Sequence, residues 1–385
     1  MRLLRYLHDF RTLPFFVLFS MAVGIGIGKA FGISDYELTP PIDAIKDIFR
    51  GRYDFTIGNT LALGVVAGLF LMIYPAMTNI RVDDLGAATR SPKQLLIVAF
   101  ANYAIAPFFM FALAEVFLRG DEDLHTGLVL YGIAPCIAMV IVFTFLALGN
   151  TPLALVLVAF NSVAQMILLP VYAKILIGNV DFDVLVVGES VVLYLGLPLV
   201  LGLLTRRAGV ARLGEAGFER FREGLNTLSV VGLLFTLVVM FGLKGDLIVN
   251  DPMIVLRMAV PMTIFFFVMF NAVYVAGWRL GFNYEDAVAV AFNSTGRDFE
   301  IAIAIAITAF SPAVAVATVV GPLIEVPVML SLVWIAMRSG QRLFAAPVAP
   351  LEAALVPSDG PGGAGGERGG AASSAPTGSE RPRPM

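Results

Sequence analysis

The sequence predicts an all-α, polytopic membrane protein with ten transmembrane helices, arranged as two five-helix repeats of opposite orientation. Of its 385 residues, 58% are hydrophobic and 14% are charged, whereas soluble domains carry about 25% charged residues. The apolar residues fall into ten continuous runs, and polar residues interrupt the ninth run. These observations indicate a membrane-embedded scaffold around an internal polar site.

The ten apolar runs are the candidate transmembrane spans, because a helix of roughly 20 residues crosses a hydrocarbon core of about 30 Å. The seventh run is short by this criterion. The runs are 13–31, 57–77, 95–118, 128–148, 153–177, 186–204, 228–243, 254–275, 288–309 and 313–337.

An even number of spans places both termini on one side of the membrane, and the distribution of Lys and Arg indicates which side. If the N-terminus is cytoplasmic, the cytoplasmic segments include the basic residues of 2–11, 81–93 and 206–222. The opposite segments hold fewer basic residues and carry the acidic runs 121–123 and 181–183. We therefore expect a plasma-membrane protein with both termini in the cytoplasm.

The spans belong to one predicted transmembrane domain, 1–343. In the loop between spans six and seven, the charged segment 215–223 is expected to form a short surface helix. The remaining residues, 344–385, are rich in Gly and Pro and contain too little apolar surface to bury a core. They are expected to form a disordered cytoplasmic tail.

Spans four and five can be laid over spans nine and ten at a constant offset. This alignment places Thr151-Pro152 on Ser311-Pro312, Gln165 on Glu325 and Cys136 on Gly296. Because five is odd, a second five-helix unit is inserted upside down relative to the first, as in the inverted repeats of many transporters. Spans four and nine are then expected to approach the midplane from opposite sides.

The polar interruption of span nine reads Asn293-Ser294-Thr295-Gly296-Arg297-Asp298-Phe299-Glu300. A charged side chain at membrane depth costs about 2.5 to 3.5 kcal/mol, so such residues normally face a cavity or a partner. Non-helical backbone at this depth persists only where it lines a protein-walled or watery space. We predict a broken helix at a binding site, with cavity-lining or ion-coupling roles for Asn293, Ser294, Thr295, Asp298 and Glu300.

Pro135 is expected to break span four, because it removes a helix hydrogen bond and releases carbonyls of the preceding turn. Cys136 follows directly and is the single cysteine, so no internal disulfide can form. A lone cysteine in an apolar helix is most often a small packing residue. Beside a helix break its thiol is also a soft ligand, suited to a thiophilic metalloid such as trivalent arsenic or antimony.

Glu325 and Arg297 are ionisable groups in mid-span, and each allows two interpretations. Glu325 is either a structural carboxylate, paired with Arg297 or with released backbone groups, or a proton-titrating group that drives exchange; the cost of its burial favours the second. Arg297 is either the counter-charge of an acidic neighbour or an anion site, because guanidinium binds oxyanions in bidentate fashion. The acidic neighbours considered are Asp298, Glu300 and Glu325.

Asn161 and Gln165 lie four residues apart and therefore share one face of span five. They either connect helices by hydrogen bonds or line the same cavity. The predicted substrate-binding residues are Cys136, Glu325, Arg297, Asn161 and Gln165.

The sequence contains no phosphate loop, catalytic triad, HExxH pair or basic patch with interleaved aromatics. We therefore expect neither an enzyme nor a cofactor or nucleic-acid partner. The expected partners are a small inorganic or anionic substrate, a coupling proton or sodium ion, and the lipid bilayer.

Several segments resemble the arsenical-resistance permease family of the bile acid/sodium symporter superfamily. They are Leu71-Met72-Ile73-Tyr74-Pro75-Ala76-Met77, Cys136-Ile137-Ala138-Met139-Val140-Ile141-Val142, Phe160-Asn161-Ser162, Phe299-Glu300-Ile301-Ala302-Ile303-Ala304 and Gly321-Pro322-Leu323-Ile324-Glu325-Val326-Pro327-Val328. The resemblance implies a core of spans three to five and eight to ten, a panel of spans one, two, six and seven, and a crossing of broken helices four and nine at the midplane. It also implies arsenite efflux in exchange for protons, with Cys136 and Glu325 at the positions of an essential thiol and carboxylate.

The sequence departs from the family pattern at both breaks. Pro135 stands where the family has Arg, and Phe143-Thr144 stands where it has Trp-Asn. Arg297 appears in span nine, where the family has Asn. An arginine has thus moved between the two broken spans, which either preserves the charge of the cavity or indicates an anionic substrate.

The leading hypothesis is a secondary active transporter, formed by 1–343, that exports trivalent metalloid (arsenite or antimonite) by proton exchange and alternating access. The alternative is a sodium- or proton-coupled carrier of an organic anion, of the bile acid/sodium symporter type, with Arg297 holding the carboxylate. A membrane-embedded sensor or structural protein is the third possibility.

Overall fold

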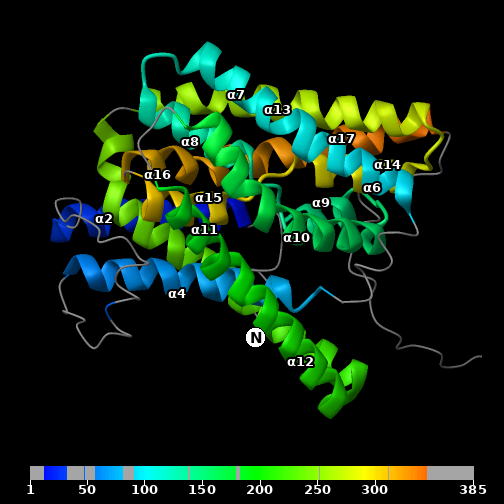
Figure 1. Ribbon diagram of the computed structural model, residues 1–385, viewed down its shortest axis with the longest axis horizontal. Helices are drawn as coiled ribbons and strands as arrows, with labels where there is room; N and C mark the ends of the chain where they lie inside the picture. The colour runs from blue at the N-terminus through cyan, green and yellow to red at the C-terminus, as the bar shows by residue number, and fades with distance from the viewer. Residues whose placement is uncertain are drawn as a thin grey trace, which may run out of the picture. The chain divides into compact units, whose positions relative to one another are not determined.

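The computed structural model describes residues 13–32, 47, 57–80, 91–137, 139–178, 183–250, 252–310 and 312–344. Within these residues every regular element is helical, apart from one isolated β-bridge (Figure 1). Five helical stretches among them are long and apolar enough to cross a membrane: Pro92–Phe117, Thr151–Leu176, Val184–Val239, Met253–Arg279 and Gly321–Leu343. The prediction of an all-α, polytopic membrane protein is confirmed, while the count of ten spans stays a prediction.

Two helices that coincide with the first two predicted spans pack closely against a third, much longer helix. A Cβ atom on Gly24 would lie 2.6 Å from the carbonyl oxygen of Val238, and one on Gly232 would lie 2.9 Å from the Met72 backbone nitrogen. In a membrane the hydrophobic effect does not drive helices together, because lipid tails are as apolar as the side chains. Helices associate by close packing instead, and small residues permit it. The three helices are α2 (Leu13–Phe31), α4 (Ile57–Met77) and α12 (Leu197–Asn250).

The long helix α12 corrects the predicted loop between spans six and seven. Its backbone turns at Gly214, where φ is 70°, a conformation that glycine adopts without strain. The helix then continues from 215 to Asn250, so the charged segment 215–223 begins the helix that contains span seven. The prediction of a separate short helix was wrong, because Glu and Arg are good helix formers and extending a helix costs less than nucleating one.

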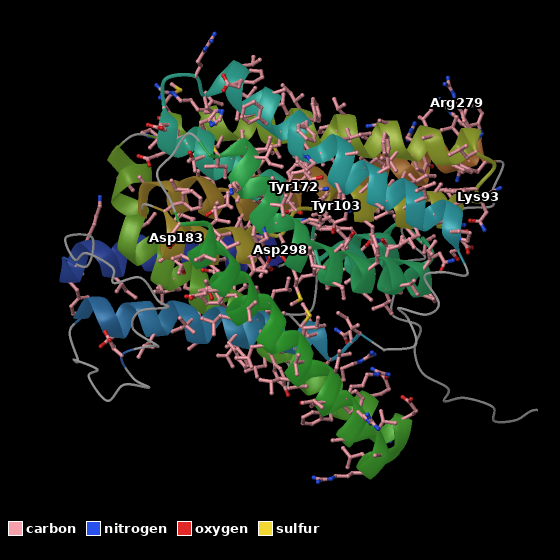
Figure 2. All side chains as sticks on the ribbon, viewed as in Figure 1. Lys93, Tyr103, Tyr172, Asp183, Arg279 and Asp298 are labelled. Carbon is pink, nitrogen blue, oxygen red and sulfur yellow. The ribbon has the colours of Figure 1, made fainter. Side chains whose placement is uncertain are left out.

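Spans three and six each contain a π-helical turn. In span three, Pro107 has no N–H, so the Tyr103 carbonyl four residues earlier has no helix donor. That carbonyl accepts a hydrogen bond from the Tyr172 hydroxyl instead (Figure 2). Asn102, in the same turn, is buried. The elements are α6 (Pro92–Phe100), η2 (Ala101–Ile105) and α7 (Ala106–Phe117) in span three, and α11 (Val184–Val191), η3 (Val192–Gly196) and the start of α12 in span six.

Spans five and eight are single helices, whereas span ten is divided at Val320. The helices of these spans are α10 (Thr151–Leu176), α13 (Met253–Arg279), α16 (Pro312–Val319) and α17 (Gly321–Leu343). Phe344, just beyond α17, packs its ring 5.3 Å from that of Tyr274. The rest of the predicted tail, 345–385, lies outside the described residues, as does the loop segment 33–46.

Spans four and nine are each interrupted within the membrane-spanning sequence. Span four comprises α8 (Glu122–Gly132) and α9 (Met139–Leu146), and span nine comprises α14 (Tyr284–Thr295) and α15 (Phe299–Ala309). Between the two parts of each span the described residues leave the helix, and Pro135 and Arg297 form an antiparallel bridge. The structure therefore contains both predicted breaks, and these position the site.

Candidate functional site

The backbones of the two breaks pair with each other at the isolated antiparallel bridge between Pro135 and Arg297. The Cys136 N–H donates to the Gly296 carbonyl at 3.0 Å, and the Asp298 N–H donates to the Ala134 carbonyl at 2.8 Å. Each break thus satisfies polar groups that the other leaves without a helix partner, as buried backbone requires. We refer to this junction as the crossover.

Proline is accommodated at the crossover because its missing donor is not needed there. The two bridging hydrogen bonds involve the residues on either side of Pro135, whose own nitrogen faces no acceptor in the bridge. Proline is tolerated in paired strands at such positions. The loss of helix at Pro135, predicted from the sequence, is thus compatible with tight pairing of the two breaks.

Gly296 is required by close contact rather than by backbone conformation. Its φ of −60° and ψ of 142° are accessible to any residue. A Cβ atom there would overlap the Val140 side chain and lie 3.0 Å from the Cβ of Cys136. It would also lie 3.6 Å from Oε1 of Glu325. Gly296 therefore marks a point at which the cysteine and the carboxylate come close to each other.

The Arg297 side chain is fully buried and its guanidinium binds only oxygen acceptors. Nε donates to the Thr295 carbonyl at 3.1 Å and Nη1 donates to the Gly132 carbonyl at 3.2 Å. Nη2 donates to the Ser294 carbonyl and to Oδ1 of Asn102, both at 2.6 Å. Since Gly132, Ser294 and Thr295 are the last residues of α8 and α14, the guanidinium lies at the C-terminal ends of both half-helices.

The guanidinium makes its direct contacts with neutral oxygens rather than with a carboxylate. Among the described residues Arg297 forms no salt bridge with Asp298, Glu300 or Glu325. A guanidinium has five N–H donors, and hydrogen bonds to protein oxygens engage four of them. One donor remains for a substrate anion, which is too few for bidentate binding.

Asn102 joins Arg297 to the polar residues of α10 and α14; its place beside Pro107 suggested a helix-connecting or cavity-lining residue, but not these partners. Its Nδ2 donates to Oδ1 of Asn161 at 3.3 Å and to the Asn293 carbonyl at 2.9 Å, while its Oδ1 accepts from Arg297. The π-helical turn beside Pro107 holds this side chain, and such turns often occur at functional sites. A buried asparagine just before a proline was the available signal.

Glu325 is fully buried and accepts two hydrogen bonds. The Tyr131 hydroxyl donates to Oε2 at 2.6 Å, and the backbone N–H of Arg297 donates to Oε1 at 3.3 Å. Tyr131 ends α8, and its ring has room because a Cβ on Gly321 would lie 2.9 Å from it. Of the partners considered from the sequence, the released backbone is the correct one, whereas Tyr131 was not anticipated.

Asp298 and Glu300 lie buried at the N-terminus of α15. Oδ1 of Asp298 accepts from the Ile301 N–H at 3.0 Å and so caps the helix, while its Oδ2 has no hydrogen-bond partner. Glu300 occupies the first turn. The positive end of the helix dipole stabilises both carboxylates, just as the negative ends of α8 and α14 stabilise the guanidinium.

The other predicted site residues are completely buried. The Thr295 hydroxyl donates to the Ala291 carbonyl within its own helix. In contrast, several polar atoms have no hydrogen-bond partner although they are shielded from solvent, and such atoms are uncommon in folded proteins. These are Nδ2 of Asn161, both amide atoms of Gln165, Oδ1 of Asn293 and Oγ of Ser294.

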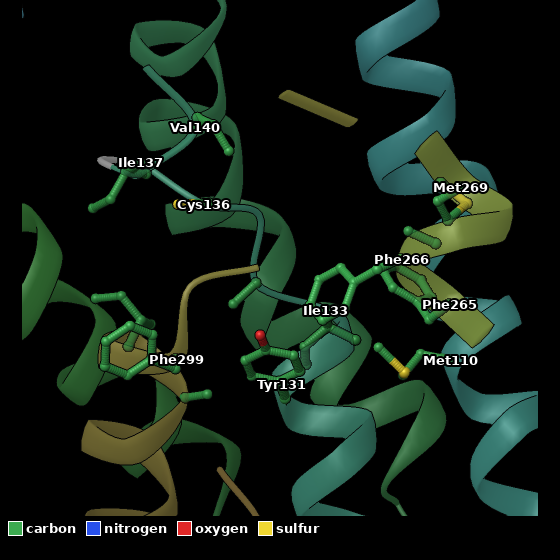
Figure 3. Close-up of a cluster of buried hydrophobic side chains, with 14 of the residues drawn as sticks. Met110, Tyr131, Ile133, Cys136, Ile137, Val140, Phe265, Phe266, Met269 and Phe299 are labelled. Atoms are coloured by element: carbon green, nitrogen blue, oxygen red, sulfur yellow. The ribbon is translucent and has the colours of Figure 1, made fainter. Parts of the chain in front are cut away.

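Cys136 is 3% exposed and lies on the extended segment of the first break. Figure 3 shows it where this segment passes the backbone leading to Phe299, with Val140 and Ile137 nearby. A Cβ built on Gly296 would have the Val140 side chain, the Cys136 Cβ and Oε1 of Glu325 as its nearest neighbours. The crossover thus brings a thiol, a carboxylate and a guanidinium together.

Interrupted apolar helices that enclose buried charges define a membrane transporter. A model of the sodium bile acid symporter family matches residues 66–251. The chain belongs to the arsenical-resistance family of the bile acid/sodium symporter superfamily.

Three relatives align with most of this chain. It is 32% identical to the arsenical-resistance protein Acr3 of Corynebacterium glutamicum over 349 residues, which cover 87% of this chain and 90% of the relative. It is 34% identical to the Acr3 protein of Alkaliphilus metalliredigens over 348 residues, which cover 86% and 92% respectively. An uncharacterized transporter of Synechocystis is 34% identical over 353 residues, covering 86% and 88%.

Proposed function

We propose that this transporter exports trivalent metalloid, as arsenite or antimonite, from the cytoplasm across the cell membrane. The observation that carries the proposal is the position of Cys136 at the crossover, where its Cβ and Oε1 of Glu325 lie 3.0 and 3.6 Å from the point that a Cβ on Gly296 would occupy. A thiolate is the soft ligand that trivalent arsenic prefers, and a carboxylate is a poor one. The names of the relatives from Corynebacterium and Alkaliphilus indicate the same class of substrate.

The polar atoms without partners suit the rest of such a substrate. Arsenous acid carries three hydroxyl groups; when the thiol forms an As–S bond, the thiol proton and one hydroxyl leave as water, and the two remaining hydroxyls both donate and accept hydrogen bonds. The Asn161 and Gln165 amides and the Ser294 hydroxyl offer donors and acceptors that the protein itself leaves unused. One thiol, supplemented by such hydrogen bonds, binds the metalloid weakly enough to release it on the other side.

We propose alternating access as the mechanism, with ten helices in two inverted repeats. The core is formed by spans three to five and eight to ten, and the panel by spans one, two, six and seven. The small-residue contacts of α2 and α4 with α12 support a separate panel. With an even number of helices both termini lie on the same side of the membrane, and the distribution of Lys and Arg makes that side the cytoplasm. The core carries the crossover from one side of the membrane to the other by moving against the panel.

Glu325 is the proposed proton-exchanging group. Protonation of its carboxyl would change the hydrogen bonds to Tyr131 and to the Arg297 backbone, and so would alter the packing of α8, α14 and α17 around Cys136. The runner-up is a carrier of an organic anion, which the description of the matching family favours. The engaged guanidinium of Arg297 counts against it, because that anion needs unoccupied N–H donors.

The single cysteine permits a site-specific test. Everted membrane vesicles that contain the wild-type protein should accumulate arsenite when a proton gradient is imposed, and Cys136→Ser should abolish accumulation without loss of membrane insertion. Labelling by a maleimide can occur only at Cys136 and should be slowed by arsenite but not by a carboxylate such as taurocholate. Undiminished accumulation by Cys136→Ser would remove the thiol from the mechanism. Carboxylate uptake that is lost in Arg297→Gln would favour the runner-up.

A further inference from the structure

The surroundings of the Arg297 guanidinium have the composition of a metal-cation site. Within hydrogen-bond distance lie three backbone carbonyl oxygens, from Gly132, Ser294 and Thr295, and one amide oxygen, from Asn102. Neutral oxygens of this kind are the ligands that hard cations take from proteins. No carboxylate takes part in a salt bridge with this group among the described residues.

The electrostatic field at this position favours a positive charge even without a carboxylate. The C-terminal ends of α8 and α14 converge there, and each helix end carries roughly half a negative charge. The ring of Phe265 adds its negative face, with its centroid 5.2 Å from Cζ of Arg297. The field and the oxygen ligands together would bind any cation of charge +1, either a side chain of the protein or a free ion.

A second buried arginine shows that this arrangement is not the usual one. Arg206 donates to the Thr78 carbonyl at 3.3 Å, lies over the ring of Phe218 and also pairs with the Glu215 carboxylate at 3.6 Å. That ion pair is the ordinary way to compensate a buried arginine. Arg297 differs because its guanidinium contacts neutral oxygens from interrupted helices, while the nearby Glu325 carboxylate binds its backbone N–H instead of its side chain.

We propose that the guanidinium of Arg297 is a tethered cation, which occupies an alkali-cation site at the crossover and makes bound sodium unnecessary. In secondary transporters, carbonyl groups of unwound backbone and C-terminal ends of half-helices coordinate the coupling sodium ion. The matching family is described as one of sodium symporters. A chain that supplies its own cation at this position still compensates the negative helix ends, and it does so without sodium. For its meaning in transport, this inference rests on the carrier function proposed above.

The test replaces the guanidinium and supplies sodium. The thermal unfolding midpoint of the detergent-purified protein is measured in sodium chloride and in choline chloride at equal ionic strength, without substrate. The wild type and Arg297→Lys should show no difference between the salts. Arg297→Ala should be less stable in choline and should gain a few degrees, saturably, as sodium is added, because a ligand that binds only the folded state raises its stability. Radioactive sodium should bind this variant and not the wild type.

Two control variants distinguish sodium binding at this site from a general stabilisation of the protein by salt. Asn102→Ala in the Arg297→Ala background removes one of the four oxygens and should weaken the response to sodium. Arg206→Ala removes a buried arginine outside the crossover and should show no sodium response. If Arg297→Ala cannot be purified in choline, extraction in sodium and the Arg297→Gln variant, which retains an amide oxygen, provide the same comparison.

A saturable sodium effect on the wild type, or a folded Arg297→Ala or Arg297→Gln protein that neither binds sodium nor is stabilised by it, would overturn the proposal. The same holds if no sodium concentration permits either variant to fold while Arg297→Lys folds normally. None of these measurements uses metalloid. The tethered-cation proposal can therefore be refuted while arsenite export is demonstrated, and it can be supported while arsenite export is refuted.

Discussion

The two breaks reach the same geometry with opposite chemistry. The break between α8 and α9 is almost entirely apolar and offers backbone carbonyls, a proline and one thiol. The break between α14 and α15 contains an arginine and an aspartate, and Glu300 follows in the first turn of α15. The first break contributes carbonyl acceptors and the proposed substrate thiol, whereas the second contributes N–H donors to those carbonyls, from the Arg297 guanidinium and the Asp298 backbone.

This difference shows that each break is stable only in the presence of the other. The Ala134 and Gly132 carbonyls receive their donors from the second break, and the Gly296 carbonyl receives its donor from the first. A polar group left without a partner in such a buried setting costs about 1 to 3 kcal/mol. The charged break would therefore be destabilising in an apolar helix that lacked a second break to pair with it.

The largest effect is expected where the breaks touch. Gly296→Ala should abolish transport and lower stability by about 1 to 3 kcal/mol, because its methyl group would overlap Val140 and push the two breaks apart. Gly26→Ala is the matched control, since a Cβ there has no neighbour within 4 Å. Vesicle transport and thermal unfolding measure both changes. Normal transport by Gly296→Ala would mean that the breaks need not pair closely.

The bond that links the apolar break to Glu325 should have a comparable effect on stability, without the abolition of transport expected at Gly296. Tyr131→Phe should cost about 1.5 to 3 kcal/mol, because it removes a hydrogen bond to a charged acceptor. Tyr274→Phe removes a bond to the neutral Ala336 carbonyl and should cost about 1 kcal/mol. A double-mutant cycle with Glu325→Gln measures the coupling by thermal unfolding. Equal costs of the two tyrosine substitutions would contradict a charged acceptor.

The cap of the charged break gives a third comparison. Asp298→Ala should cost about 1 kcal/mol, because the Ile301 N–H loses its acceptor at the start of α15. Asp298→Asn retains a capping oxygen and should keep most of the stability. Thermal unfolding of both variants distinguishes capping from charge. If Asn is as costly as Ala, the negative charge rather than the cap stabilises the break.

The smallest effect is expected at Pro135. Pro135→Ala should cost at most about 0.4 to 1 kcal/mol through added freedom of the unfolded chain, because the bridge uses neither a donor nor a ring at this position. Transport should stay within a factor of about two, since the bridging hydrogen bonds that align the breaks are retained. Vesicle assays check this. A large loss would show that the proline itself maintains the break.

The sequence by itself determined the membrane scaffold and the location of both breaks. Apolar runs identified the C-terminal ends of α2 and α4, at Phe31 and Met77, because helix length in a bilayer depends on composition rather than on distant contacts. The cost of burying charge pointed to the segment around Arg297, and proline chemistry pointed to Pro135. The prediction around Gly214 failed, because the extent of a charged helix depends on local propensity that hydropathy does not measure.

Only the tertiary structure decided which groups meet. No spacing rule links Asn102 to Arg297, or Tyr131 to Glu325, because each pair joins helices far apart in the sequence. The sequence suggested carboxylates as partners of Arg297, on the ground that opposite charges attract. The fold supplies carbonyl oxygens instead, because interrupted helices bring unpaired backbone groups to the same place, and this arises only when two breaks cross.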